Sequence, residues 1–144
     1  MPRIAGTHVG LDPDGLDVFR PIIFVEIKVG TRSIRVPALV DSGADNTLVP
    51  APFVAPLGVD FHRLPAGHGG SGPGGNLDVR LCQGTMIWEQ GKAVLMTQFM
   101  VAEPGKGPDT VLLGRADFFK HYVPRFSWHK SPPSFDLDPV PRRR

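Results

Sequence analysis

Two acidic residues stand close together in the stretch VPALVDSGADNTLVP, residues 36 to 50. Asp41 directly follows an apolar run and precedes Ser42-Gly43, and Asp45 comes four positions later. A carboxylate at the end of a buried strand loses solvation, which is costly unless a partner compensates it. Two partners would do so: a bound metal ion, or a second carboxylate that shares one proton. Such an acid pair can activate a water molecule for hydrolysis.

The metal alternative lacks ligands at the usual spacing. The chain has no H-E-x-x-H motif and no Cys-His cluster. We therefore expect no metal and no cofactor, and we expect surface or capping roles for the five histidines. Ser42 lacks the G-x-S-x-G context of a nucleophile elbow, which weighs against a Ser-His-Asp triad. The histidines are His8, His62, His68, His121 and His129.

A glycine-dense segment, GHGGSG at 67 to 72, satisfies the pattern G-x-G-x-x-G. A dinucleotide site needs that pattern between a strand and a helix N-terminus. Pro73-Gly74-Gly75 follows here and prevents a helix from starting, so we do not expect a nucleotide site. Two interpretations stay open: the tip of a mobile hairpin, or a plain flexible surface loop.

The composition indicates one soluble domain. The chain has 144 residues, of which 41% are hydrophobic and 21% charged. The 17 glycines and 16 prolines favour turns and short strands over long helices. A net charge of +2 is too small to indicate nucleic-acid binding. The terminal cluster Arg142-Arg143-Arg144 is more typical of a solvated tail, although a nucleic-acid role for it would show as steep salt dependence.

Cysteine usage and hydropathy predict a location. Cys82 is the single cysteine, so an internal disulfide is impossible, which suits a reducing compartment. Its context, VRLCQG, is typical of a strand with a buried, inert thiol. The N-terminal stretch lacks an apolar core of signal-peptide length, and nothing approaches the length of a membrane span. We expect a soluble cytoplasmic protein that has no membrane partner.

The elements that must position Asp41 are β-strands. Residues 22 to 40 alternate apolar and polar side chains on both sides of Gly30-Thr31-Arg32, which predicts a β-hairpin that ends at Asp41. Residues 1 to 18 have no periodicity and are predicted to form an extended arm. Further strands are predicted at NTLVP, near 77–83, 85–89 and 93–102, at TVLLG, and in a final pair at RFSW and SFDLD; one helix is predicted at RADFFKHY, 115–122. The predicted class is all-β with one short helix.

By itself, the Asp-Ser-Gly triplet favours a β-turn with an Asx cap. The larger pattern is more specific. RPIIFVEIKVGTRSIRVPALVDSGADNTLVP resembles the start of the retroviral-type, retropepsin-like aspartic proteases. GHGGSGPGGNLDVRL resembles their glycine-rich flap, and VLLGRADFFKHY resembles their hydrophobic-hydrophobic-Gly-Arg block before a short helix. The three blocks occur in the family's order and cover about residues 20 to 128, and the chain is similar to single-domain members of bacterial type.

The resemblance implies roles for the active-site stretch. Asp41 matches the catalytic aspartate, and Ser42 the hydroxyl residue that braces the two active-site loops across a dimer. Gly43 matches a glycine whose carbonyl contacts substrate, and Ala44 completes the support of that loop. The residues implied to bind substrate or to form ion pairs are Asp45, Asn46, Arg115 as the partner of Asp45 within the chain, and Arg20 as a partner from the other subunit. The implied flap residues are Gly67, His68, Gly69, Gly70, Ser71 and Gly72.

The resemblance also implies an architecture and a partner. The expected fold is a closed or near-closed β-barrel with a glycine-rich flap hairpin and one short C-terminal helix. Residues 1–18 would be an N-terminal arm, 19–128 the protease domain, and 129–144 a C-terminal strand and basic tail. Because the chain carries one Asp-Ser-Gly, a pair of catalytic carboxylates requires a homodimer that cleaves a peptide or protein substrate. The flap lacks the family's apolar tip, and the arm and tail have no counterpart in its minimal core. A catalytically idle module for peptide binding or dimerisation is therefore the alternative.

Overall fold

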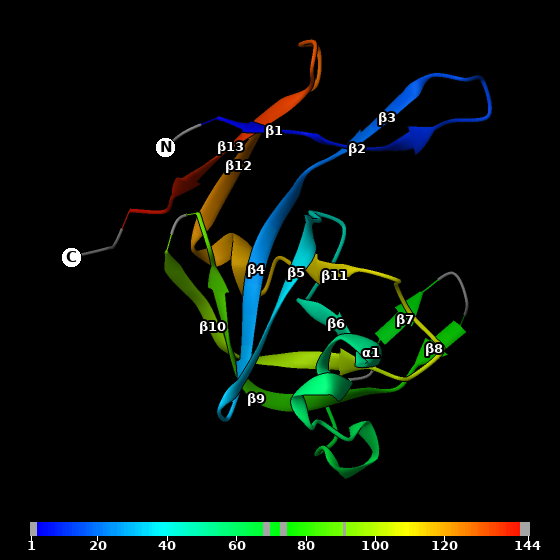
Figure 1. Cartoon of the computed structure of the whole chain (residues 1–144), viewed down its shortest axis with the longest axis vertical. Coiled ribbons are helices and arrows are strands. Elements are labelled where there is room, and N and C mark those ends of the chain that lie inside the picture. The colour runs from blue at the N-terminus through cyan, green and yellow to red at the C-terminus, as the bar shows by residue number, and fades with distance from the viewer. Residues whose placement is uncertain (1–2, 68–69, 73–74, 91, 142–144) are drawn as a thin grey trace.

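Six strands close into a β-barrel at the centre of the chain (Figure 1). The computed structural model describes residues 3–67, 70–72, 75–90 and 92–141. In their order around the barrel, the strands are β10 (Ala93–Ala102), β6 (Leu48–Pro50), β11 (Val111–Leu113), β5 (Arg32–Val40), β4 (Ile22–Val29) and β9 (Val79–Trp88). This architecture confirms the predicted all-β fold class.

The predicted hairpin over residues 22–40 is confirmed. β4 and β5 pair antiparallel in unbroken register along their whole length. Gly30 begins the turn with a φ of +60°, a conformation that glycine adopts at no steric cost. Ile23, Val25 and Ile27 on β4 are buried, whereas Phe24, between Ile23 and Val25, is exposed. The alternation that predicted the strand therefore also defines the face that β4 presents to the core.

One long strand, β9, replaces two predicted strands. The sequence indicated strands near 77–83 and 85–89 with Gly84 as a break, but β9 runs through Gly84 without interruption. Space explains the glycine, because a Cβ there would lie 3.0 Å from both the Lys28 carbonyl oxygen and Phe99 Cε1. The prediction was wrong because a glycine that permits close packing resembles, in sequence, one that ends a strand.

The strand order brings two distant parts of the chain together at one end of the barrel. β11 lies between β5 and β6, parallel to β5 and antiparallel to β6. The loop 41–47, which joins β5 to β6, therefore lies beside the segment 114–117 that follows β11. This crossing determines which residues can support the Asp-Ser-Gly turn.

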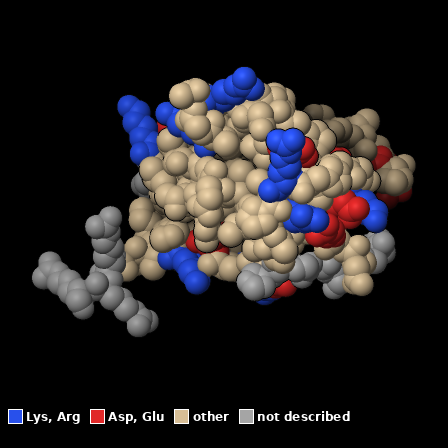
Figure 2. All heavy atoms as spheres, turned by 90° about the horizontal axis from the view of Figure 1, so that it is seen from below, with Lys and Arg blue, Asp and Glu red and all other residues tan. Residues whose placement is uncertain are grey.

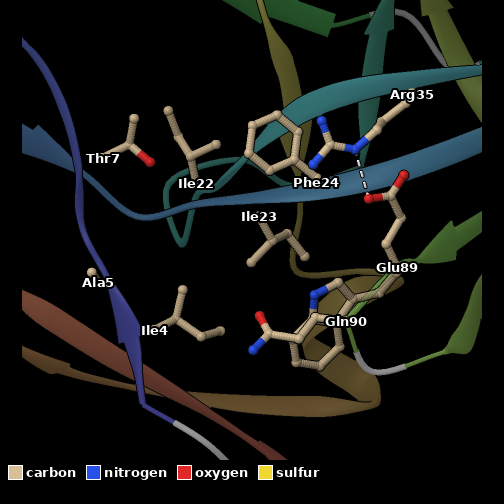
Figure 3. Close-up of a pocket in the computed structure, with 10 residues that line it drawn as sticks. Ile4, Ala5, Thr7, Ile22, Ile23, Phe24, Arg35, Glu89 and Gln90 are labelled. Atoms are coloured by element: carbon tan, nitrogen blue, oxygen red, sulfur yellow. Dashed lines mark hydrogen bonds and ion pairs between the residues drawn. The ribbon is translucent and has the colours of Figure 1, made fainter.

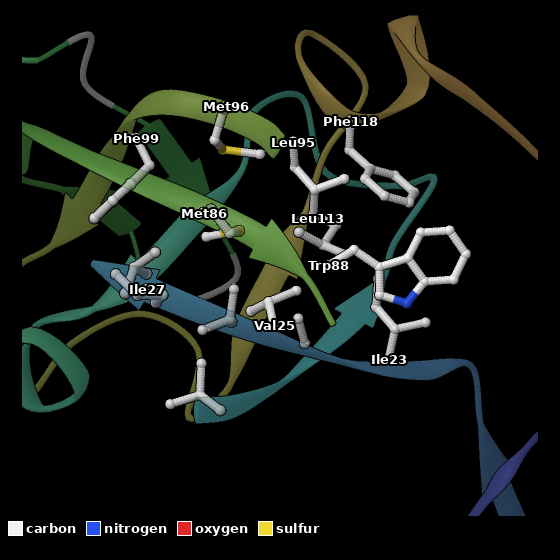
Figure 4. Packing of buried hydrophobic residues seen from close by; sticks show 14 of the residues in the cluster. Ile23, Val25, Ile27, Met86, Trp88, Leu95, Met96, Phe99, Leu113 and Phe118 are labelled. Carbon is white, nitrogen blue, oxygen red and sulfur yellow. The ribbon is translucent and has the colours of Figure 1, made fainter. Parts of the chain in front are cut away.

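The barrel interior holds the hydrophobic core. Figure 4 shows side chains from β4, β9, β10 and β11 packing against one another. Trp88, Ile27 and Met86 are among the largest fully buried side chains, and Phe118 joins them from outside the barrel strands. Each such burial contributes about 1.5–3 kcal/mol relative to exposure. The core therefore holds the strand ends, including the end of β5, in fixed positions.

Helical segments in the described residues are short. They are α1 (Ala51–Val54) and three 3-10 turns, η1 (Ala55–Leu57), η2 (Phe61–Arg63) and η3 (Phe118–Lys120). No helix in this part of the chain is long and apolar enough to span a bilayer.

The prediction of a helix at 115–122 was wrong, because the helical structure in this segment is the 3-10 turn η3. Asp117 starts the turn by accepting a hydrogen bond from the Phe118 backbone N–H. Tyr122 already belongs to a strand and pairs with Pro139. The rings of Phe118 and Tyr122 stack with their centroids 5.4 Å apart. Strand pairing has thus overridden the helical pattern.

The terminal segments form two further sheets. β12 (Tyr122–Ser127) and β13 (Ser134–Pro139) pair antiparallel, which confirms the predicted final strand pair, and β1 (Ile4–Ala5) adds to β13. β2 (Thr7–Leu11) and β3 (Asp17–Arg20) form a separate hairpin. Much of the predicted extended arm is therefore β-structure, while the proposed boundaries at residues 18 and 128 stay predictions.

A second small hairpin lies in the glycine-dense segment. β7 (Gly70–Gly72) and β8 (Gly75–Leu77) pair antiparallel, with Ser71 opposite Asn76. Of the predicted flap residues, His68 and Gly69 lie outside the described residues. The others belong to this hairpin or, in the case of Gly67, lead into it.

Candidate active site

Asp41 stands at the point where the chain leaves the barrel. Its backbone N–H donates to the Leu113 carbonyl at 3.1 Å, and Val40 before it is buried. The side chain is half-buried, and its Oδ1 accepts the Gly43 N–H at 2.9 Å. A Cβ on Gly43 would lie 3.2 Å from that same oxygen. The turn therefore orients the carboxylate through a backbone amide, and a larger residue at position 43 would crowd it.

Two backbone hydrogen bonds join the active-site loop to the segment after β11. The Arg115 N–H donates to the Ala44 carbonyl at 2.9 Å, and the Ala116 N–H donates to the Asp45 carbonyl at 2.8 Å. Gly114 makes this contact possible, since a Cβ there would lie 2.3 Å from the backbone carbon of Asn46. The loop is consequently tied to this segment at two successive residues.

Thr47 is a supporting residue that the sequence did not reveal. It is fully buried, its Oγ1 donates to Asp117 Oδ1 at 2.6 Å, and the same oxygen accepts the Gly114 N–H at 3.1 Å. Asp117 Oδ2 also accepts the Thr47 N–H at 3.3 Å. A capping pattern, Asp directly before a turn of aromatic residues, was the available signal for Asp117. Nothing in the sequence indicated that Thr47 would meet it.

Asp45 and Arg115, the predicted partners within the chain, form an ion pair. The Arg115 side chain is 59% exposed and that of Asp45 82% exposed. An exposed pair of this kind stabilises a fold little, so both groups are available to a ligand. Among the described residues Arg20 is not joined to Asp45; it ends β3, opposite Thr7. The substrate roles of Asp45 and Arg115, and the role of Arg20 across a dimer, stay predictions.

The remaining predicted residues lie around Asp41 without further bonds that define a role. Ser42 and Asn46 are exposed, and Ala44 is half-buried. The bracing function implied for Ser42 needs a second subunit and stays a prediction. Gly67, the first predicted flap residue, donates its N–H to the Val79 carbonyl at 2.9 Å.

The described residues contain no group of three or more side chains arranged to hold a metal ion. Cys82 is buried, as predicted, and desolvation raises the pKa of its thiol. In the loop network, Asp45 pairs with Arg115 and Asp117 accepts from Thr47, while the Asp41 carboxylate accepts the Gly43 N–H.

Among the solved structures that resemble this chain are two proteases. EIAV protease in complex with an inhibitor superposes with a TM-score of 0.53 at 25% identity, over 67% of this chain and 83% of the viral chain. A retropepsin-like aspartic protease from Rickettsia conorii superposes with a TM-score of 0.55 at 14% identity, over 94% of this chain and 98% of that chain. No family model and no curated protein matches the sequence.

The chain has the retropepsin fold. The described residues of the three sequence blocks occupy the strand end at Asp41, the β7–β8 hairpin, and β11 with the segment after it. The Rickettsia conorii match spans 94% of the chain and hence extends beyond the barrel strands. At 14% identity that match supports the fold and not the chemistry.

A pocket of about 240 Å³ lies away from the retropepsin active-site loop (Figure 3). The pocket lies between the N-terminal strands on one side and β4 with the end of β9 on the other. Ile4 and Thr7 line its N-terminal side. On the other side the Arg35 guanidinium lies 3.9 Å above the Phe24 ring and donates to Glu89 at 2.6 Å. Asp41 does not line this pocket.

The charged side chains are mixed over the face that Figure 2 shows. Lysine and arginine lie among aspartate and glutamate, and no continuous basic surface covers that face. With a net charge of only +2, this distribution gives no support to a nucleic-acid partner.

Proposed function

We propose that this chain is an aspartic endopeptidase that acts as a homodimer, with one Asp41 from each subunit forming the catalytic pair. The observation that carries the proposal is the Asp41 carboxylate at the end of β5, oriented by the Gly43 amide in a retropepsin fold. The second carboxylate would come from another copy, because the chain carries one Asp-Ser-Gly. A two-fold axis between the two loops would bring the Asp41 side chains together.

The proposed reaction is peptide-bond hydrolysis without a covalent intermediate. The ionised Asp41 of the pair removes a proton from water, and the neutral Asp41 polarises the scissile carbonyl. Two carboxylates held together share one proton, so activity is expected at acidic to mildly acidic pH. The rigid attachment of the loop to residues 114–117 supports this role, because an acid pair needs fixed geometry.

The substrate proposed is an extended peptide that pairs as an added strand beneath the flap. The strands of the flap, β7 and β8, offer backbone groups for such pairing. Asp45 and Arg115, both exposed beside Asp41, would bind the peptide backbone. We also propose a cytoplasmic location. It is supported by Cys82, the single cysteine, which is buried and cannot form a disulfide within the chain, as suits a reducing compartment.

The direct experiment substitutes the catalytic carboxylate without changing its shape. Asp41→Asn should lower the rate of casein cleavage at pH 4–6 by about 10²–10⁴-fold, the contribution of a general acid or base. Asp109→Asn, in the loop before β11, is the matched control and should cleave at the wild-type rate. Equal cleavage by wild type and Asp41→Asn would remove Asp41 from the mechanism.

A peptide-binding module without catalysis is the second candidate. The observation that favours it is the flap, where β7 reads Gly-Ser-Gly and supplies no large side chain to clamp a substrate. In that case wild-type protein would bind extended peptides, as measured by fluorescence anisotropy, and would release them uncut. Cleavage that depends on Asp41 excludes this candidate.

A further inference from the structure

Exposed apolar side chains gather on two terminal hairpins. The described part of the chain has nine large hydrophobic residues in the exposed class, and six of them lie on these hairpins. Val9, Leu11 and Leu16 belong to the β2–β3 hairpin. Val123, Phe126 and Trp128 belong to the β12–β13 hairpin and its turn. Apolar surface concentrated in this way marks an interaction site more often than scattered single residues do.

The β2–β3 hairpin has no third strand beside it among the described residues. An isolated two-stranded hairpin is marginally stable in water unless it packs on another surface. Its turn is nonetheless well formed, since Asp12 Oδ1 accepts the N–H groups of Asp14 and Leu16, each at 2.9 Å. The turn thus presents two acidic residues next to Leu11 and Leu16, both 65% exposed.

The β12–β13 hairpin presents a complementary surface. Phe126 and Trp128 are exposed, and both lie against the buried ring of Phe135, with centroids 6.3 and 6.4 Å away. His129 and Lys130 follow in the turn and are exposed. One hairpin therefore combines aliphatic and acidic residues, and the other combines aromatic and basic residues.

Both hairpins extend from the barrel, as Figure 1 shows, and their tips point in different directions. The base of the β2–β3 hairpin lies against the turn of the β12–β13 hairpin, because a Cβ on Gly6 would lie 3.3 Å from Phe19 Cβ and 3.4 Å from Trp128 Cη2. The N-terminal hairpin is also attached beside the active-site turn, since the Val40 N–H donates to the Pro21 carbonyl at 2.9 Å. A second copy that completes the Asp41 pair would approach this same end of the molecule.

We propose that the β2–β3 hairpin of one subunit docks on the β12–β13 hairpin of a second copy, and reciprocally. Leu11 and Leu16 would cover the partner's exposed aromatic side chains, while Asp14 would lie near the partner's basic turn. The reciprocal contact is the self-complementary kind that a two-fold dimer requires. This inference rests on the proposed function for the identity of the partner, because the catalytic site is incomplete without a second copy.

The first test substitutes an exposed residue of the hairpin and measures dimerisation of the full chain by sedimentation equilibrium. Leu16→Ser should raise the dimer Kd about fivefold or more, as expected for an apolar anchor. Val94→Ser is the matched control, since Val94 is 60% exposed on β10 and outside both hairpins. Its Kd should equal that of wild type, and thermal unfolding should show all three proteins folded.

A charge exchange tests the pairing itself. Asp14→Lys and Lys130→Asp should each weaken the dimer, and the double variant should recover most of the lost affinity. An unchanged Kd in Leu16→Ser, or no recovery in the double variant, overturns the docking of the hairpins. A dimer that depends on Leu16 but cleaves no peptide would overturn the protease proposal alone. A cleaving dimer indifferent to Leu16 would overturn this inference alone, and a wild-type chain that stays monomeric contradicts both.

Discussion

At the residue scale, the orientation of the Asp41 carboxylate depends on the residues that hold its loop in place. The Gly43 amide orients its carboxylate, and Thr47 joins the loop to Asp117 and Gly114. The Thr47 hydroxyl both donates and accepts a hydrogen bond while fully buried. Loss of this hydroxyl would leave the buried Gly114 N–H without its partner, which is costlier than loss of an exposed bond.

Thr47→Val tests this support. The variant keeps the shape of the side chain but leaves the Gly114 N–H unpaired and removes the hydrogen bond from Thr47 to Asp117, so we expect the free energy of unfolding to fall by about 1–3 kcal/mol. Urea denaturation measures the change. Thr47→Ser retains the hydroxyl and should lose markedly less. If the valine variant were as stable as wild type, the hydroxyl would not be a structural link.

Cys82 offers a second prediction at this scale. Burial raises the pKa of its thiol, so the folded chain holds the proton at a pH where the unfolded chain has begun to release it. As the pH rises past the ordinary thiol pKa, the stability that this group contributes is therefore lost. A thiol reagent at about pH 8.5 should label the denatured chain rapidly and the native chain slowly. Equally fast labelling of both states would show that the thiol is accessible.

At the element scale, the strands that were predicted correctly are those in which apolar and polar residues alternate. β4 and β5 could be predicted because one face is buried and their turn contains Gly30. β9 was divided wrongly at Gly84, since the sequence does not show whether a glycine ends a strand or admits a neighbour. The helix at 115–122 failed because Tyr122 pairs with β13, a contact that depends on the tertiary fold.

The same scale limits what could be predicted of the site. Asp41 and its turn were evident from the apolar run that ends in an acid, and the resemblance linked Asp45 to Arg115. The crossing of β11 between β5 and β6 was not evident, and it is this crossing that brings Thr47 to Asp117. Contacts between segments so far apart in the chain leave no periodic trace in either segment.

Gly114→Ala tests the close approach of the two loops. A Cβ at this position would overlap the Asn46 backbone, so the loops must separate, at a cost of about 1–3 kcal/mol or more. Thermal unfolding should show a lower midpoint, and casein cleavage should fall as the Asp41 turn shifts. Ala116→Gly, at an exposed position two residues later, is the control and should alter both much less. Wild-type behaviour of Gly114→Ala would mean that the loops are not in tight contact.

At the scale of the whole molecule, the account requires two copies of the chain. A single copy holds one Asp-Ser-Gly turn, and the pocket beside the N-terminal strands does not include it. The chain has the retropepsin fold. We expect a second copy to complete the site at the end of the molecule that carries the exposed Asp45–Arg115 pair and the apolar terminal hairpins. The central claim is therefore that catalysis belongs to the pair and not to the single chain.

Mixing wild-type chains with Asp41→Asn chains tests that claim most directly. Total protein is kept constant and well above the dimer Kd, subunits are allowed to exchange, and casein cleavage is measured against the wild-type fraction. Because a mixed dimer lacks one carboxylate, activity should follow the square of that fraction, about one quarter of full activity in an equal mixture. A linear dependence, with about half of full activity in the equal mixture, would mean that each chain acts alone and would contradict the shared site.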